Sequence, residues 1–228
     1  MNFEVFEQST GVQFINKDLL KQAFTHRSYL NEHRSLGIDH NERLEFLGDA
    51  VLELAVTHFL YTKFPGHKEG DLTAFRSALV NTNTLSEAAT KLGMNAFLLL
   101  SKGEAKDTGR ARQFILANTF EAFIGALYLD QGYEAAEQFV AKEILTLIDD
   151  IVSNQKFIDS KSKFQEAAQE HVGITPSYRL VREQGPDHNK VFVVAVLLGE
   201  IEIAEGEGKS KQEAEQQAAQ MALEKRGW

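Results

Sequence analysis

The sequence predicts an all-α N-terminal domain followed by a small α+β domain whose elements run α-β-β-β-α. Two observations carry this prediction. Apolar residues recur at helical spacing from residue 14 to about residue 151. Beyond residues 153–156, where that pattern lapses, three short segments rich in strand-forming residues lie between two helical ones. A chain of 228 residues is long enough for two domains of ordinary size.

The first half is expected to be helical almost throughout. Apolar residues repeat every three to four positions at Leu19, Leu20, Ala23 and Phe24, and again at Leu44, Leu47, Val51, Leu54 and Ala55. Pro65-Gly66 interrupts the helical pattern, Gly70-Asp71 begins the next helical stretch, and further breaks are expected at Gly93, Gly103 and Gly109. His26 and Arg27 are expected late in a helix, where they have a structural role.

In the second half of the chain, the spacing of the apolar residues changes. A helix is expected over 160–171, strands over 178–181, 191–197 and 201–203, and a final helix over 211–225. Turn-forming residues at 185–189 and 198–200 separate the strands. We therefore expect domains at 1–152 and 159–228, joined by a linker at 153–158.

Composition excludes several classes of protein. The chain has no cysteine, which rules out disulfides, thiolate catalysis and cysteine-bound zinc. No apolar run reaches the roughly 20 residues needed to cross a membrane, and the N-terminus does not resemble a secretory signal. We therefore expect a cytoplasmic protein. The net charge of −9 argues against a generic binder of polyanions, so a nucleic-acid role requires local basic groups or metal ions.

Three acids gather in residues 41–52. At about 100° per residue, Glu42, Glu45 and Asp49 fall on one face of a helix. An acidic face of this kind is often simply solvated, and from this segment alone a solvated face is as good an interpretation as a cation site. Like charges at this spacing repel one another, however, and a divalent cation is a reasonable compensating charge.

A second segment favours the cation. Residues 114–129 are apolar on nearly every side, which is typical of a buried helix, and Asn118 and Glu121 interrupt it on one face. A buried carboxylate without a partner costs several kcal/mol, so Glu121 needs either an internal arginine or a cation shared with Glu45 and Asp49. Carboxylate, amide and water oxygens suit Mg²⁺ or Mn²⁺. Neither segment has the Glu-x-x-His pairs usual in di-iron bundles. Such a site suits hydrolysis of a phosphodiester.

Residues 41–52 resemble the signature stretch of the ribonuclease III family almost letter for letter. Residues 25–28, 69–71 and 116–129 fall where that family has its other motifs. The resemblance implies that Glu45, Asp49 and Glu121 are catalytic metal ligands and that Glu42 and Glu69 are auxiliary acids. It also implies that Phe46 packs into a socket on a partner subunit. A plain core aromatic is the alternative for Phe46.

Asn118 departs from the family pattern, which commonly has aspartate there. An amide offers one neutral carbonyl oxygen in place of an anion, so the affinity for metal should fall. Asn118 is either a natural ligand variant or a substitution that impairs catalysis. Because the rest of the constellation is intact, we favour a working enzyme.

The final helix carries signs of anion binding. Ser210 and Glu213 have the spacing of a capping box, and the helix N-terminus with Lys209 and Lys211 beside it suits a phosphate. An ordinary capped surface helix is the alternative. Residues 159–226 nevertheless resemble a double-stranded-RNA-binding domain, most closely at 206–219.

The same resemblance assigns groups that contact the minor groove. By position these are Gln165, Glu166 and Gln169 on the first helix and His188 in the loop between the first two strands. Glutamine and glutamate can exchange hydrogen bonds with 2′-hydroxyls, which selects RNA over DNA. Gln212 stands where many members have a lysine, so weaker binding with a smaller salt dependence is expected.

Together these features predict a homodimeric endonuclease that hydrolyses double-stranded RNA with Mg²⁺, or Mn²⁺ as a substitute. It would leave 5′-phosphate and 3′-hydroxyl ends with short 3′ overhangs, and process ribosomal RNA precursors and other structured transcripts. One alternative is a double-stranded-RNA-binding protein in which Asn118 impairs cleavage. A second is a carboxylate-bundle hydrolase or oxidase acting on small molecules, which would have no use for the C-terminal half.

Overall fold

A computed structural model of the chain describes residues 2–33, 37–153, 160–185 and 190–228. The chain divides into two compact units, Met1–Phe157 and Ile158–Trp228. The predicted linker at 153–158 falls at this division, although residues 154–159 lie outside the described part. Each unit has its own hydrophobic core.

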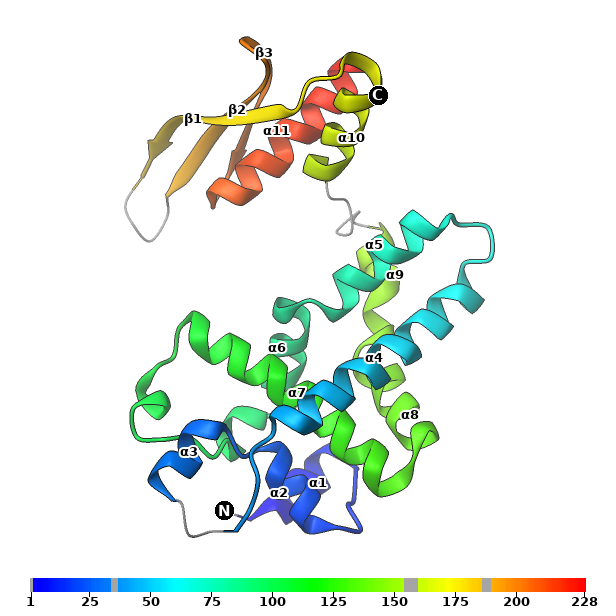
Figure 1. Cartoon of the computed structure of the whole chain (residues 1–228), viewed down its shortest axis with the longest axis vertical. Helices are drawn as coiled ribbons and strands as arrows, with labels where there is room; N and C mark the ends of the chain where they lie inside the picture. The colour runs from blue at the N-terminus through cyan, green and yellow to red at the C-terminus, as the bar shows by residue number, and fades with distance from the viewer. Residues whose placement is uncertain (1, 34–36, 154–159, 186–189) are drawn as a thin grey trace. The chain divides into compact units, whose positions relative to one another are not determined.

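The first unit is helical, as predicted (Figure 1). Its α-helices are α1 (Phe3–Thr10), α2 (Lys17–Ala23), α3 (Arg27–Glu32), α4 (Glu42–Lys63), α5 (Glu69–Val80), α6 (Thr82–Lys91), α7 (Arg110–Gln131), α8 (Tyr133–Glu143) and α9 (Ile148–Ser153). In the described part of this unit, three short 3₁₀ helices join them, namely η1 (Met94–Phe97), η2 (Glu104–Lys106) and η3 (Leu145–Leu147). Helix begins at residue 3, earlier than the apolar repeat suggested.

His26 and Arg27 do not lie late in a helix, and that prediction was wrong; Arg27 is the first residue of α3. Helix α2 ends at Ala23, and His26 is the N-cap of α3, where its ring Nδ1 accepts a hydrogen bond from the Ser28 backbone at 3.3 Å. The reason is tertiary. The backbone N–H of His26 donates to the Leu99 carbonyl at 3.1 Å, so it is not free to continue a helix.

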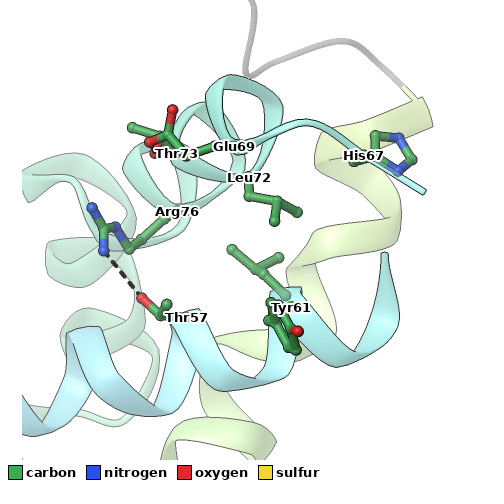
Figure 2. A pocket seen from close by; sticks show the side chains of 8 residues that line it. Thr57, Tyr61, His67, Glu69, Leu72, Thr73 and Arg76 are labelled. Atoms are coloured by element: carbon green, nitrogen blue, oxygen red, sulfur yellow. Dashed lines mark hydrogen bonds between the residues drawn. The ribbon is translucent and has the colours of Figure 1, made fainter. Parts of the chain in front are cut away.

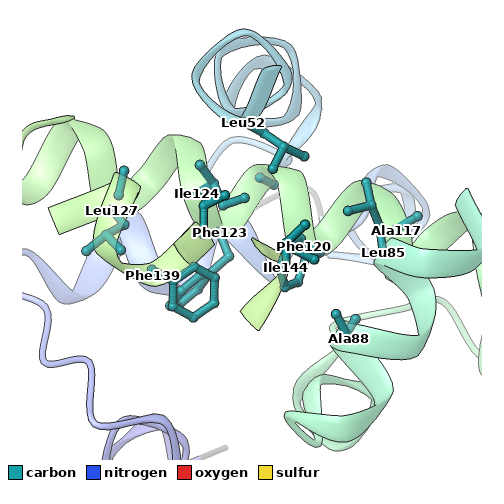
Figure 3. Close-up of a cluster of buried hydrophobic side chains, with 14 of the residues drawn as sticks. Leu52, Leu85, Ala88, Ala117, Phe120, Phe123, Ile124, Leu127, Phe139 and Ile144 are labelled. Carbon is teal, nitrogen blue, oxygen red and sulfur yellow. The ribbon is translucent and has the colours of Figure 1, made fainter. Parts of the chain in front are cut away.

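Helix α7 is the centre of the first core, with α2, α4, α6 and α8 packed around it (Figure 3). Its middle is buried on every side except where Asn118 and Glu121 lie. Phe120 and Phe123 are fully buried, and Phe139 of α8 packs with both of them. Truncating one such ring to alanine typically costs about 3–5 kcal/mol, so this core holds α7 firmly in place.

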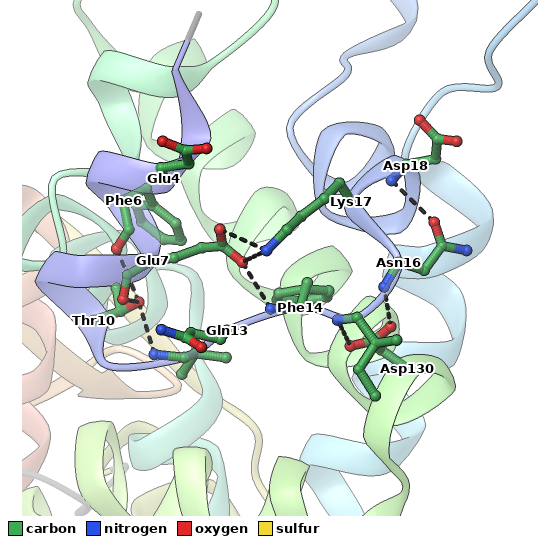
Figure 4. Close-up of polar contacts among 12 residues, drawn as sticks. Glu4, Phe6, Glu7, Thr10, Gln13, Phe14, Asn16, Lys17, Asp18 and Asp130 are labelled. Carbon is green, nitrogen blue, oxygen red and sulfur yellow. Dashed lines mark hydrogen bonds and ion pairs between the residues drawn. The ribbon is translucent and has the colours of Figure 1, made fainter.

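Two carboxylates hold the N-terminal helices against the core (Figure 4). Glu7, only 5% exposed, accepts hydrogen bonds from the Lys17 ammonium at 2.6 Å and from the Phe14 backbone at 2.7 Å. Asp130, at the end of α7, accepts hydrogen bonds from the backbone N–H groups of Ile15 and Asn16 at 2.8 and 2.7 Å. These bonds fix α2 beside α7.

The second unit is an antiparallel sheet with helices on one face. Helix α10 (Ser160–Val172) precedes strands β1 (Pro176–Gln184), β2 (Val191–Leu198) and β3 (Ile201–Gly208), which pair in the order β1-β2-β3, and α11 (Lys211–Arg226) ends the chain. The predicted α-β-β-β-α order is therefore confirmed, with β1 and β3 longer than expected.

Helix α11 lies close against β3 because glycine leaves room for it. A methyl group at Gly206 would lie 2.7 Å from the backbone carbon of Gln217, and one at Gly208 would lie 2.6 Å from the Cβ of Glu213. Phe164 of α10 is fully buried in the core below, where Trp228 stacks on it with ring centroids 5.7 Å apart. Within the described residues, no helix is both long enough and apolar enough to span a membrane.

Candidate active site and RNA-binding face

The start of α4 is held by a buried asparagine. Asn41 is 2% exposed; its backbone N–H donates to the Thr25 carbonyl at 2.9 Å and its side-chain amide to the Ala23 carbonyl at 3.2 Å. These bonds fix where α4 begins. Glu42 and Glu45 lie in its first turn, where the positive end of the helix dipole favours carboxylates.

Two glycines bring α4 against α7. A methyl group at Gly48 would overlap the backbone carbonyl of Glu121 and stand 2.8 Å from the Gly125 nitrogen. A methyl group at Gly125 would overlap the Leu44 carbonyl in turn. Only residues without a Cβ allow so close a crossing, which sets Glu45 and Asp49 of α4 beside Glu121 of α7. Sequence reasoning missed both glycines, although each interrupts the middle of a long helix.

The crossing creates a concentrated negative field. Burial, followed by the charges of Asp49, Glu45 and Glu53, raises the pKa of Glu121 to about 8. The pKa of Glu45 is also raised, mainly by burial and by the neighbouring charge of Glu42. Glu53 was not predicted, but it lies four residues after Asp49 and so continues the same face of α4.

Asn118 joins this cluster as a hydrogen-bond donor. Its side-chain amide donates to Glu45, which opposes the rise in the pKa of that carboxyl. An amide that donates its N–H in this way still has a carbonyl oxygen with which to accept or ligate.

In the part of the chain that the structure describes, basic side chains reach only the outer acids of the cluster, where Arg76 lies 3.8 Å from Glu53. Glu45, Asp49 and Glu121 form no ion pair there with lysine or arginine, which rules out the internal-arginine alternative for those residues. Arg27 instead lies 3.4 Å from Glu42. Across the same residues, no group of three acidic or histidine side chains is arranged to hold a metal ion.

Phe46 lies on the surface, so the core-aromatic alternative is wrong. Its side chain is 81% exposed and borders a pocket of about 610 Å³. The other residues lining the pocket come from α2, from the start of α4 and its preceding residues, and from the end of α7; they are Leu19, Gln22, His40, Glu42, Arg43, Leu44, Leu47 and Leu129.

Glu69 does not join the other acids within one chain. It is the first residue of α5 and accepts a hydrogen bond from Thr73 at 2.9 Å. It lines a separate groove of about 450 Å³ with Tyr61 and Arg76 (Figure 2). Tyr61 lies 16 residues after Glu45 on α4, a separation of about 24 Å at 1.5 Å per residue.

In the second unit, the predicted α10 residues share one exposed surface. Gln165, Glu166 and Gln169 line a shallow groove of about 430 Å³ together with Glu170. His188 lies outside the described residues.

The predicted cap of α11 forms, with one difference. Ser210 Oγ accepts a hydrogen bond from the Glu213 backbone at 3.1 Å. The Glu213 carboxylate reaches the backbone N–H of Lys209 at 2.8 Å, one residue before the cap. Lys209 and Lys211 are both exposed beside this helix end.

Comparisons with known proteins agree with this architecture. Residues 16–148 match the model of a family described as ribonuclease-III-like, and residues 160–226 match the double-stranded RNA binding motif. Ribonuclease 3 of Anoxybacillus flavithermus is 49% identical over 225 residues, which cover 99% of this chain and 94% of that protein. Ribonuclease 3 of Bacillus cereus is 46% identical over 223 residues, or 98% of this chain and 91% of that protein.

A solved structure matches the first unit. It is the nuclease domain of ribonuclease III from Campylobacter jejuni, described for structural flexibility in a region involved in dimer formation. It is 40% identical with a TM-score of 0.56, over 65% of this chain and 97% of that one.

Proposed function

The chain belongs to the ribonuclease III family, and from that membership we propose that it cuts double-stranded RNA with a divalent cation held by Glu45, Asp49 and Glu121. Its relatives and its RNA-binding unit make it an endoribonuclease for double-stranded RNA. The observation that supports the metal is the raised pKa of Glu121, to about 8, beside Glu45 and Asp49; among the described residues none of these three acids pairs with lysine or arginine.

The donor set fits Mg²⁺, with Mn²⁺ as a substitute. Carboxylate oxygens of Glu45, Asp49 and Glu121 and the amide oxygen of Asn118 are the ligands that these hard cations prefer. A bound cation would lower the pKa of a coordinated water and neutralise charge on the phosphoryl oxygens. Attack of a water on the phosphorus, with the 3′ oxygen as the leaving group, would leave 5′-phosphate and 3′-hydroxyl ends.

The side chains around the ligands have their own tasks. The Asn118 amide, itself a candidate ligand, is also a hydrogen-bond partner of Glu45. Glu42 faces Arg27 and lies at the exposed edge of the cluster, which suits an auxiliary role near the RNA strand. Glu69 can serve as an auxiliary acid only in an assembly that brings α5 of a second copy near the cluster.

We propose a homodimer with Phe46 at its centre. Phe46 of one copy would enter the pocket bordered by Leu19, His40 and Leu129 of the other, and the contact would repeat by symmetry because ring and pocket lie side by side. Leu54 and Tyr61, 57% and 73% exposed, continue the apolar surface along α4. Two symmetric sites would each cut one strand and leave short 3′ overhangs.

In the RNA-binding unit, Gln165, Glu166 and Gln169 would contact 2′-hydroxyls in a minor groove, with His188 in a second groove. Lys209, Ser210 and Lys211 would hold the phosphates between them. Processing of ribosomal RNA precursors and other structured transcripts in the cytoplasm is the role we propose for the enzyme.

One observation favours the alternative, a protein that binds double-stranded RNA but cuts it poorly. The Asn118 amide is a hydrogen-bond partner of Glu45, one of the carboxylates that a cation would use. An aspartate at residue 118 could not donate that bond and would add a charge to the site.

Incubating the full-length chain with long duplex RNA and Mg²⁺, Mn²⁺ or EDTA tests the proposal. We expect metal-dependent fragments carrying 5′-phosphates, loss of cleavage in Glu121→Gln, and no change in Glu134→Gln, an exposed acid at the start of α8. Asn118→Asp should raise the rate or lower the metal concentration required. Retention of RNA without fragments would favour the binding protein, and no retention at all would favour the small-molecule alternative.

A further inference from the structure

Two side chains near the start of α7 share a face with the carboxylate cluster. At about 100° per residue, Arg110 and Phe114 lie within roughly 20° of Glu121 around the helix, and Asn118 lies within about 80° of all three. Phe114 is therefore about 6 Å along the axis from Asn118, and Arg110 about 12 Å, at 1.5 Å per residue. The cluster and this pair form one line along α7.

Packing in the core does not account for Phe114. Its ring is 45% exposed, whereas Ile115, Leu116 and Ala117, which follow it directly, are buried. The Arg110 guanidinium lies over the ring, 5.7 Å from its centroid, in cation–π contact.

Among the described residues, the guanidinium of Arg110 forms no ion pair. Arg112, two residues along and on the other side of the helix, is different: its guanidinium donates to the Asn95 side chain at 3.0 Å and to the Glu104 carbonyl at 2.7 Å, so it fastens the segment that precedes α7. Arg112 is therefore structural, and Arg110 is available to a ligand.

We propose that Arg110 and Phe114 form a ledge that positions the sugar–phosphate backbone of the RNA strand being cut, next to the scissile phosphate. The inference rests on the proposed nuclease function and adds two positioning residues to it. The guanidinium binds a phosphate through paired N–H donors. The ring packs against the ribose beside it, since the bases of a duplex are paired and the wide minor groove presents sugars and 2′-hydroxyls.

The neighbouring acids explain why a basic residue is needed at this place. Glu42, Glu45 and Glu121 repel the phosphates on either side of the one that a cation holds. A positive charge on the same face, two to three turns away, offsets that repulsion and keeps the strand in line with the cluster. If the ledge instead bound a protein partner, its substitution would leave the binding and cleavage of RNA unchanged. The test below separates these two possibilities.

Steady-state cleavage of a defined RNA duplex, measured over a series of salt concentrations, tests the ledge. Arg110→Ala should raise KM about tenfold, the effect of losing a hydrogen bond to a charged group. It should also reduce the slope of log kcat/KM against log salt by about 0.9, the effect of losing one phosphate contact. Arg110→Lys should recover most of the slope but less of the affinity.

Phe114→Ala should act on position more than on affinity. We expect kcat to fall several-fold and the cut to spread over adjacent nucleotides, as read from the 5′ ends of the products. Phe114→Leu keeps the apolar packing and should therefore melt like the natural chain, but it should spread the cut as Phe114→Ala does. A spread cut in a variant with an unchanged melting curve is not due to a folding defect.

Matched controls are Ile15→Ala, which removes another exposed apolar side chain, and Lys91→Ala, which removes an exposed cation at the end of α6. If the ledge variants match these controls in KM, salt slope and cut position, the ledge is wrong while the nuclease stands. If the natural chain binds duplex RNA without cutting it, the proposed cleavage is wrong. The ledge is then tested by binding alone: the affinity of Arg110→Ala for duplex RNA should depend less on salt than that of the natural chain, and an equal dependence would contradict the ledge.

Discussion

Replacing Gly48 by alanine should separate the two helices that build the candidate active site. The added methyl group would overlap the Glu121 carbonyl, 2.6 Å from its carbon and 2.8 Å from the Gly125 nitrogen. Ordinary contacts begin at 3.4 Å, so these two distances fall short by 0.8 and 0.6 Å. Neither neighbour is a side chain that could rotate away, so α4 and α7 must move apart.

The free energy of unfolding should fall as a result. Overpacking of this kind costs about 1–3 kcal/mol, and the better helix propensity of alanine returns up to about 1 kcal/mol. At about 2–4 °C per kcal/mol for a unit of this size, the melting temperature should fall by several degrees. Gly70→Ala is the matched control, because Gly70 lies in helix α5 with nothing within 4 Å of its missing Cβ; that variant should melt at or slightly above the natural temperature.

Thermal melting followed by circular dichroism measures this loss of stability, and tryptophan fluorescence shows in which unit it occurs. Trp228 is the only tryptophan and packs in the second unit, so its emission should follow an unchanged transition there. RNA cleavage by folded Gly48→Ala should fall about 10- to 100-fold, since misplacing catalytic groups by about 1 Å has effects of that order. A variant that melts and cuts like the natural chain would refute the role of this crossing.

Three further outcomes are expected. In EDTA, the protonated Glu121 carboxyl should contribute its full stability below pH 4.5, its ordinary pKa, and lose that contribution as the pH rises to about 8. The loss should be up to about 1.4 kcal/mol per pH unit. Glu121→Gln should remove the resulting fall of melting temperature with pH, and an unchanged fall in that variant would assign it to other groups. Phe46→Glu should convert a dimer to a monomer in sedimentation, whereas Ile15→Glu, equally exposed, should not; a natural chain that sediments as a monomer contradicts the proposed dimer. Ser210→Ala should destabilise the second unit by about 1 kcal/mol, as followed by Trp228 fluorescence, and weaken RNA binding; identical transitions would mean that the cap contributes nothing.

Several features of the candidate site could be predicted because they are local. The helical period places Glu42, Glu45 and Asp49 on one face whatever the rest of the chain does. The serine and glutamate of the α11 cap act over three residues. Where a contact depends on the tertiary fold, local reasoning failed: His26 begins a helix because its backbone N–H pairs with Leu99, which lies 73 positions away in the sequence.

The amino-acid sequence alone determined that the first unit is helical, that the second has the order α-β-β-β-α, and which acids are available for a metal. Apolar periodicity and residue type are sufficient for these, because they act within a few turns of chain. Only the tertiary structure decided which acids meet. Gly48 and Gly125 allow α4 and α7 to touch, so Glu121 lies in the field of Asp49 and Glu45, while Glu69 lies in another groove. That outcome depends on contacts between residues more than 70 positions apart in the sequence, such as Gly48 and Glu121, which no local pattern specifies.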